Sequence, residues 1–240
     1  MLTLRPPKCD IKAISANVRG LNRGYDPLNT LFMDSTLTQP NPTPGNSKFH
    51  KLISIFNQST YNILAIQEHK LKTQDEKDHK SYLDYFPNIS SLISYNDEGT
   101  AAGGTALLIK HDTLGITPNS IHWSTGLNGR VTTAQFTKDE EGMHFASIYA
   151  PHDPTERVQF FQDLFLSDLI SEDSLSGGDF NCVPNIHLDT SSSTKLPYPN
   201  KGAQQLEAGM ANLGLTDILR THAGKKGKPI FTRLSDTRNS

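Results

Sequence analysis

Hydrophobic residues in this chain form short runs that are separated by longer polar segments. The run 62–68 is mostly apolar until its last two residues, a pattern typical of an interior strand that delivers Glu68 at its carboxyl end. Residues 130–136 and 143–149 carry strand patterns on either side of an acidic turn, which predicts an antiparallel pair. The other segments with strand patterns are residues 11–17, 89–95 and 105–110.

Apolar residues also recur at helical spacing. Residues 47–58 are expected to form an amphipathic helix with Ser47 as its N-cap. A second helix is predicted to begin at Pro154, because proline fits the first helical position. A third is predicted over 201–213, and the highly charged run 73–85 favours a solvated helix or loop.

The expected strands come in groups with helices between them, which indicates a layered α/β domain. The length of 240 residues fits one large domain or two small ones. We expect residues 1–10 to be an N-terminal tail and residues 11–240 to form one domain. Within that domain, residues 23–47 are rich in Pro, Asn and Thr, which predicts a flexible insertion.

Composition narrows the class of protein only a little. The formal charge of -2 gives no global basic field for nucleic acid, and it does not exclude a local one. With only Cys9 and Cys182, a disulfide framework is not expected. No apolar run is long enough to span a bilayer, and residues 1–10 lead into no apolar signal region. We therefore expect a nuclear or cytoplasmic protein that is not secreted and does not bind a membrane.

The stretch 177–181 reads Gly-Gly-Asp-Phe-Asn and carries the most chemical information in the chain. Its two glycines predict a sharp turn. If the segment is extended, Asp179 and Asn181 point to the same face and present a carboxylate beside an amide. An ordinary Gly-Gly turn followed by common turn residues explains the stretch equally well. The preceding residues 171–176 have only Leu175 as an apolar residue, so the strand there is expected to be weak.

Several polar residues lie at or just past the end of an expected strand: Asn17, Glu68, Tyr149, Asp179 and Asn181. Sites in layered α/β folds assemble at such strand ends. Carboxylate and amide oxygens are hard ligands that suit Mg²⁺ or Mn²⁺, and no cluster of His and Cys favours zinc. A divalent metal with few protein ligands, next to an Asp that orients a water, would serve phosphodiester hydrolysis.

The order of the motifs resembles that of the endonuclease/exonuclease/phosphatase superfamily, which has the deoxyribonuclease I-like fold. The motifs are Asn-Val-Arg-Gly-Leu-Asn at 17–22, Ile-Gln-Glu at 66–68, Gly-Gly-Thr-Ala-Leu-Leu-Ile at 103–109, Ser-Ile-Tyr-Ala-Pro at 147–151 and Gly-Gly-Asp-Phe-Asn at 177–181. The first motif, together with Gly129-Arg130-Val131 and Phe231-Thr232, looks most like the apurinic-type endonuclease domain of non-LTR (LINE-like) retrotransposons. The likeness covers nearly the whole chain and implies a four-layered α/β sandwich, with two packed β-sheets flanked by helices.

The resemblance also implies a DNA-nicking, divalent-metal-dependent endonuclease. Glu68 would bind Mg²⁺ or Mn²⁺, and Asn17 would support that metal site. Asp179 would orient or deprotonate the nucleophilic water. Asn181 would hold that Asp or the phosphate, and Tyr149 would hydrogen-bond the phosphate. The partner would be DNA, and a downstream reverse transcriptase would belong to the parent polyprotein.

Further residues are candidates for substrate contact. Thr232 would be a lesser contact near the substrate backbone. Arg157 opens a helix near the Tyr149 strand and would face phosphate, with an ordinary helix-surface Arg as the alternative. His69 and His152 lie beside Glu68 and Tyr149 in the sequence, and surface or packing roles are the alternative for both.

The sequence departs from the family pattern at its carboxyl end. The family closes with a strand that carries an Asp and then a Ser-Asp-His signature, and neither is found here. We therefore expect a sandwich with its C-terminal strands missing, from a truncated reading frame or a fragment of a longer polyprotein. Three functions stay open: an active endonuclease, a non-catalytic retroelement remnant that binds nucleic acid, and an inositol phosphatase or sphingomyelinase-like phosphodiesterase on the same fold.

Overall fold

The computed structural model describes residues 11–18, 47–95, 103–184, 200–218 and 221. The chain divides into two compact units. The first comprises Met1–Tyr149 with Asp173–Asp179, and the second comprises Ala150–Glu172 with Phe180–Ser240.

The expected tail 1–10 and nearly all of the expected insertion 23–47 lie outside the described residues. The same holds for residues 222–240, so the expected loss of the C-terminal strands is not tested. A single domain over 11–240 likewise stays a prediction.

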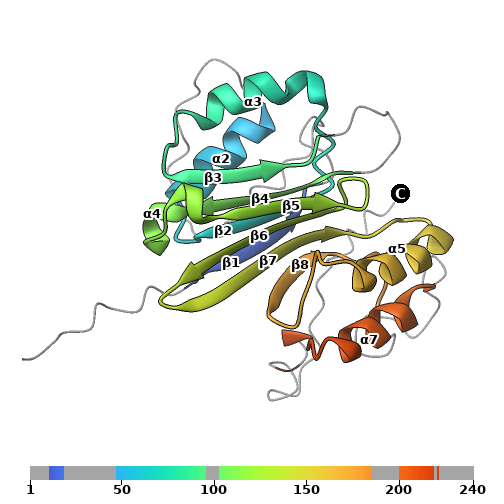
Figure 1. Cartoon of the computed structure of the whole chain (residues 1–240). Helices are drawn as coiled ribbons and strands as arrows, with labels where there is room; N and C mark the ends of the chain where they lie inside the picture. Colours follow the sequence, from blue (N-terminus) through green and yellow to red (C-terminus); the bar gives the residue numbers. More distant parts are fainter. Residues whose placement is uncertain (1–10, 19–46, 96–102, 185–199, 219–220, 222–240) are drawn as a thin grey trace, which may run out of the picture. The chain divides into compact units, whose positions relative to one another are not determined.

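Strands of the first unit form a mixed sheet, here sheet A, in the order β1-β2-β4-β3 (Figure 1). β1 (Ala13–Asn17) runs parallel to β2 (Ile63–Gln67). β4 (Thr105–Lys110) pairs antiparallel with β2 and with β3 (Ile89–Ile93). Every residue of β2 and β4 is buried, as expected for apolar strands that are covered on both faces. Each strand expected in this part of the chain is therefore present, with small shifts at its ends.

The second sheet of this unit, sheet B, has the order β5-β6-β7-β8. β6 (Val131–Lys138) and β7 (Glu141–Tyr149) form the expected antiparallel hairpin. β8 (Ser174–Asp179) runs parallel to β7. β5 (His122–Gly126) was not expected from the sequence, because this edge strand is largely exposed and lacks an apolar stripe. Its pairing with β6 makes it a strand.

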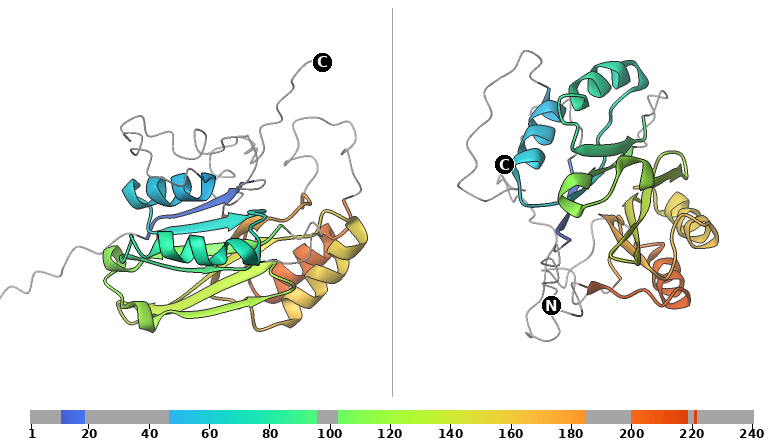
Figure 2. Two further views of the ribbon diagram at one scale, coloured as in Figure 1. Left: turned by 90° about the horizontal axis from the view of Figure 1, so that it is seen from above. Right: turned by 60° about the vertical axis from the view of Figure 1, so that its left-hand side comes forward.

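Helices α2 (Lys48–Gln58) and α3 (Glu76–Leu83) cover one face of sheet A (Figures 1 and 2). Ser47 caps α2 as predicted, because its side chain accepts a hydrogen bond from the His50 N–H at 3.3 Å. The apolar stripe of α2 packs in one core with alternate residues of β2 and β4. The members of this core from these three elements are Phe49, Leu52, Ile53, Phe56, Leu64, Ile66, Ala106 and Leu108.

The other face of sheet A packs against sheet B through a second core. Successive residues of a strand point to opposite faces, so β2 and β4 contribute to both cores. The residues that β2, β4, β6 and β7 place in this core are Ile63, Ala65, Leu107, Ile109, Ala134, Phe136 and Phe145. The expected α/β sandwich of two packed sheets with flanking helices is thus confirmed.

A buried polar cluster joins the two sheets next to these cores. Gln67 at the end of β2 is 1% exposed, and its Nε2 donates to Ser147 Oγ of β7 at 2.9 Å. Ser147 Oγ in turn donates to the Ile66 carbonyl at 2.9 Å. Ser15 of β1 donates to Gln67 Oε1 at 3.2 Å. Buried polar groups need such partners, so these bonds fix which residues of the two sheets face each other.

Gly177 and Gly178 do not form the turn that the sequence suggested. Both lie inside β8, in register with Ser147 and Ile148 of β7. A Cβ at position 177 would lie 3.1 Å from Ser15 Cβ of β1, and one at position 178 would collide with the Ile148 carbonyl. The glycines therefore permit the close approach of β8 to its neighbours, and backbone flexibility is not their role.

The described part of the second unit contains α5 (Pro154–Leu166) and α7 (Ala203–Asn212), both expected from the sequence. Asp153 caps α5, with its Oδ1 accepting from the Thr155 and Glu156 N–H groups. The two helices contact each other, and Gly209 of α7 lies directly against the Phe165 ring.

Short helical elements complete the described chain: η1 (Thr73–Asp75), α4 (His111–Leu114) and η2 (Pro118–Ser120). Within the described residues, no helix combines the length and the hydropathy needed to cross a bilayer.

We expect Ser147→Ala to lower the free energy of unfolding by about 1–3 kcal/mol, because Gln67 Nε2 and the Ile66 carbonyl lose a buried partner. Urea denaturation measures this loss. Ser124→Ala is the matched control, because Ser124 lies exposed on edge strand β5 and should change stability by less than about 0.5 kcal/mol. Equal effects of the two substitutions would contradict a stabilising role for the buried cluster.

Candidate active site

Asn17 and Asp179 meet where the two sheets end. Asn17 is the last residue of β1 in sheet A, and Asp179 is the last residue of β8 in sheet B. The Asn17 Nδ2 donates to Asp179 Oδ2 at 2.6 Å, although 162 positions separate the two residues. The bond holds the Asp179 carboxylate in a defined orientation.

Glu68 follows β2 directly, as the sequence predicted, in a left-handed conformation with φ of 57°. Its N–H donates to the Gly104 carbonyl at 2.9 Å, and the Lys70 N–H donates to the Gly103 carbonyl at 2.9 Å. A positive φ is uncommon for a residue with a side chain and is maintained only when the surroundings enforce it. The two backbone bonds to the start of the β4 segment provide that enforcement.

Gly103 brings Glu68 and Tyr149 close together. A Cβ at position 103 would lie 2.8 Å from the Cα and Cγ of Glu68 and 2.8 Å from Cε1 of Tyr149. Only glycine leaves both side chains where they are, because real Cβ atoms are not found at such distances. Glu68 and Tyr149 thus lie on either side of one glycine.

These contacts close a ring of four residues. Tyr149 is paired in register with Asp179, and Asp179 is bonded to Asn17. Asn17 is paired in register with Gln67, the residue before Glu68. Glu68 adjoins Tyr149 through Gly103. The structure therefore places four of the sequence-derived site residues at one end of the first unit.

Arg130 is a residue at this site that the sequence patterns did not single out for chemistry. Its guanidinium carbon lies 5.5 Å from the centre of the Tyr149 ring, and the Tyr149 N–H donates to the Arg130 carbonyl at 2.8 Å. The preceding Gly129 carbonyl accepts from Ser94 Oγ at 2.8 Å and from Thr105 Oγ1 at 3.0 Å. This anchored turn holds a positive charge over the phenol ring.

Lys70 is a second residue at this site that the sequence patterns did not single out for chemistry. Its Nζ lies 2.8 Å from Glu68 Oε1, and the two side chains are 40% and 18% exposed. Lys70 also has a positive φ, of 55°, and its backbone bond to Gly103 fixes its position. Spacing alone could not reveal this ion pair, because residues two apart face each other only when the chain turns sharply between them.

His69 is a buried packing residue. It is 1% exposed, its Nδ1 accepts from the Leu71 N–H at 3.0 Å, and its Nε2 lies 3.3 Å from the Thr105 carbonyl. These partners require the tautomer with the proton on Nε2. Burial lowers the pKa of His69 to about 4, so the ring is neutral at pH 7. His69 anchors the turn between Glu68 and Lys70.

Asn181 belongs to the second unit, where its Nδ2 donates to the Ala150 carbonyl at 2.8 Å. β8 ends at Asp179, and Asn181 is left-handed with φ of 48°. The segment is therefore not extended through Asn181, so the condition under which Asp179 and Asn181 would share one strand face is not met. The partner observed for Asp179 within the first unit is Asn17. His152, also in the second unit, is exposed.

Arg157 is placed differently from the expected phosphate contact. It is 0% exposed, and its guanidinium donates within the second unit to the carbonyls of Lys201, Pro151 and His152 at 2.8, 3.3 and 3.2 Å. A guanidinium that is buried and bonded to carbonyl oxygens fixes the backbone and does not face a ligand. We therefore assign Arg157 a structural role. Thr232 lies outside the described residues.

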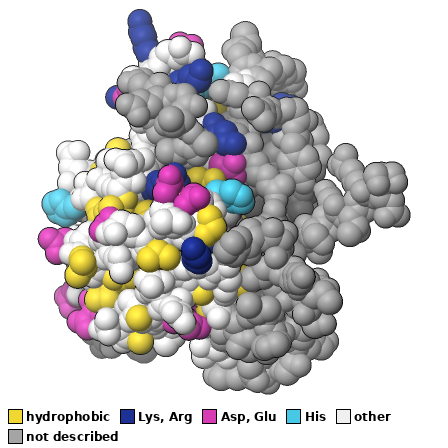
Figure 3. All heavy atoms as spheres, turned by 90° about the vertical axis from the view of Figure 1, so that its right-hand side faces the viewer, with side chains coloured by type: hydrophobic (Ala, Val, Ile, Leu, Met, Phe, Trp, Pro, Cys, Tyr) yellow, Lys and Arg dark blue, Asp and Glu magenta, His cyan; other side chains and the backbone are white. Residues whose placement is uncertain are grey.

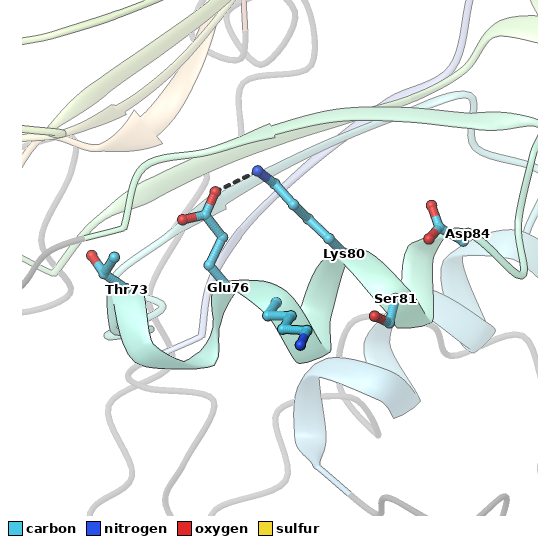
Figure 4. Close-up of a pocket in the computed structure, with 6 residues that line it drawn as sticks. Thr73, Glu76, Lys80, Ser81 and Asp84 are labelled. Carbon is cyan, nitrogen blue, oxygen red and sulfur yellow. Dashed lines mark ion pairs between the residues drawn. The ribbon is translucent and has the colours of Figure 1, made fainter.

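A polar depression beside α3, shown in Figure 4, is lined by Thr73, Glu76, Lys77, Lys80, Ser81 and Asp84. It includes the Glu76–Lys80 ion pair and none of the four site residues. On the face drawn in Figure 3, acidic and basic side chains of the described residues are mixed and form no large area of one sign. This agrees with the formal charge of -2.

The donor set at the four-residue site fits a hard divalent cation. Glu68 offers a partly exposed carboxylate, and Asn17 and Asp179 add an amide and a second carboxylate. Among the described residues there is no group of three or more His, Cys, Asp and Glu side chains that could hold a metal ion. A metal here would thus have few protein ligands and would keep several waters, which is typical of Mg²⁺.

No protein-family model matches the sequence, and no curated protein matches it. Among solved structures, AP endonuclease LMAP from Leishmania major is similar with a TM-score of 0.60 at 15% identity, over 88% of this chain and 69% of that one. The endonuclease domain of TRAS1, a telomere-specific non-LTR retrotransposon, gives a TM-score of 0.46 at 13% identity, over 85% and 71%. The Xenopus laevis APE2 catalytic domain gives a TM-score of 0.46 at 18% identity. That match covers 65% of this chain and 61% of that one.

The first of these similarities shows that the chain has the deoxyribonuclease I-like fold, as the motif order implied. The other two scores are too low to add to this conclusion. At such identities a shared fold does not establish a shared activity.

We expect His69 to make stability depend on pH. Its folded pKa of about 4 lies below the ordinary value of 6.5, so the unfolded chain binds more protons between these values. The contribution of neutral His69 to the free energy of unfolding is complete above pH 6.5. It is lost as the pH falls toward 4, by an amount on the order of 3 kcal/mol. Urea denaturation at pH 7 and pH 5 should give a smaller difference for His69→Gln than for the wild type. An unchanged difference would contradict a neutral, buried His69.

Proposed function

We propose that this chain is a divalent-metal-dependent phosphodiester hydrolase that nicks DNA. The observation that supports this most directly is the ring of Asn17, Glu68, Tyr149 and Asp179, drawn from both sheets to one end of the first unit. It combines two carboxylates, an amide and a phenol, which is the set of groups that phosphodiester hydrolysis on this fold would use. The fold itself is compatible with this activity and does not specify it.

Glu68 is the proposed metal ligand, and the side-chain oxygen of Asn17 is proposed to support the same metal site. A bound Mg²⁺ or Mn²⁺ would supply positive charge to the phosphoryl oxygens. Glu68 suits this role because its carboxylate is partly exposed while its backbone is fixed by the bonds to the Gly103–Gly104 segment. A ligand on a fixed backbone keeps its geometry when solvent or substrate enters.

Asp179 is the proposed base that orients and deprotonates the attacking water. The Asn17 amide donates to Asp179 Oδ2 at 2.6 Å and so orients the carboxylate. The phenol of Tyr149 would donate to a phosphate oxygen, and the Arg130 guanidinium next to its ring would add positive charge. Asn181 stays a candidate for phosphate contact on sequence grounds alone.

DNA is the proposed substrate, and a retroelement polyprotein is the proposed origin. Both rest on the Asn-Val-Arg-Gly-Leu-Asn opening at 17–22 and on the order of the other motifs. The competing proposal is a non-catalytic retroelement remnant that binds nucleic acid. The active endonuclease and the non-catalytic remnant would have the same fold, so a measurement of activity has to distinguish them.

We expect the wild-type protein to nick supercoiled plasmid in the presence of Mg²⁺. Glu68→Gln and Asp179→Asn should each reduce the nicking rate by about 10²- to 10⁴-fold, because they remove the metal ligand and the base. The conversion of supercoiled to open-circular DNA measures the rate. Glu141→Gln is the matched control, because Glu141 is exposed at the start of β7.

Equal rates for the wild type, Glu68→Gln and Asp179→Asn would show that these residues do not carry the reaction. A wild type that shifts DNA in a gel and shows no nicking would favour the remnant.

Asn17→Ala should lower the nicking rate by about 10-fold or more, because the Asp179 carboxylate loses its orienting donor. Since Asn17 is half-buried at a strand end, the substitution should leave the circular dichroism spectrum unchanged. A rate equal to that of the wild type would remove Asn17 from the site.

A further inference from the structure

We propose that Lys70 is a tethered counter-ion of Glu68 that competes with the divalent cation for the same carboxylate and thereby weakens metal binding. This inference rests on the proposed function, because it assumes that Glu68 is the metal ligand. It assigns a role to a side chain that lies outside the ring of four residues. The observation behind it is the 2.8 Å separation of Lys70 Nζ and Glu68 Oε1.

The backbone fixes both members of the pair. Glu68 and Lys70 have φ values of 57° and 55°, and their N–H groups donate to the carbonyls of Gly104 and Gly103. His69 between them is buried and bonded to the Leu71 N–H. The side chains of Glu68 and Lys70 therefore emerge from a rigid turn at a set separation, and no ordering of the backbone is needed for them to meet.

An ammonium group and a divalent cation cannot share the same carboxylate oxygen without repulsion. A cation that binds Glu68 has either to displace Lys70 from Oε1 or to bind close to its positive charge. Lys70 is 40% exposed, so its flexible stem lets the ammonium move into solvent when it is displaced. Pairs of this exposure are weak, so the competition lowers metal affinity without preventing binding.

A second role for Lys70 predicts the opposite result. If the lysine served to hold Glu68 in the orientation that the metal requires, its removal would weaken binding. Competition predicts that removal strengthens binding, because both the ion pair and the nearby positive charge disappear. The sign of the change in metal affinity therefore distinguishes a competing lysine from a positioning lysine.

The test is a titration of the full chain with Mn²⁺ in the absence of DNA. The electron paramagnetic resonance signal of free Mn²⁺ measures how much of the ion is bound. Lys70→Met removes the charge and keeps an unbranched stem, so it places no new demand on the positive φ. Lys70→Met should bind Mn²⁺ about two- to fivefold more tightly than the wild type at low salt, and the difference should shrink as salt screens the pair. Lys70→Arg, which keeps the charge, should bind like the wild type.

Lys72→Met is the matched control, because Lys72 is exposed in the same segment and removal of its charge should have a smaller effect. Two results together would overturn this inference alone. The wild type would bind Mn²⁺ and Glu68→Gln would not, while Lys70→Met would bind Mn²⁺ no more tightly than the wild type. Wild-type protein without any Mn²⁺ binding that depends on Glu68 would overturn both this inference and the proposed metal site.

Discussion

The candidate site depends on hydrogen bonds that join two β-sheets at one end. Asn17 bonds to Asp179, and Gln67 bonds to Ser147, in each case from sheet A to sheet B. The buried bond fixes the alignment of the sheets, because a slip would break the bonds of Ser147 to Gln67 Nε2 and to the Ile66 carbonyl. With the sheets so aligned, the bond from Asn17 sets the orientation of the Asp179 carboxylate. The residues that support the fold and those proposed for chemistry are thus adjacent in the same strands.

A second constraint is the turn after β2. Two residues with positive φ are maintained there by bonds to the Gly103–Gly104 segment and by the buried ring of His69. Strain of this kind is maintained only where the surroundings over-determine the backbone, and it is common at functional sites. Here it fixes the backbone of Glu68 and places Lys70 Nζ 2.8 Å from Glu68 Oε1. One local conformation therefore decides both the position of the proposed ligand and the charge that opposes its cation.

Much of the fold could be predicted from local patterns. β2, β4, α2 and α5 follow from apolar runs, helical spacing and capping residues, because these signals act over a few neighbouring positions. Edge strand β5 has no such signal, since its pairing with β6 makes it a strand. The glycines of β8 suggested a turn, because the close approach of β1 and β7 that requires them cannot be read from their neighbours in sequence. Arg157 suggested a phosphate contact, because burial of a guanidinium against carbonyls is a tertiary property.

The amino-acid pattern alone indicates which kinds of side chain stand at strand ends, and the order of these residues matches a known fold. Strand-end position and residue type are local properties, so Asn17, Glu68, Tyr149 and Asp179 could be named without coordinates. Three contacts follow from the folded chain and not from local pattern: Asn17 with Asp179, Arg130 over Tyr149, and Lys70 with Glu68. These contacts depend on sheet packing and on backbone dihedrals in the left-handed region. Neither leaves a periodic pattern in the chain, because each is set by atoms that are distant in sequence or by a single turn.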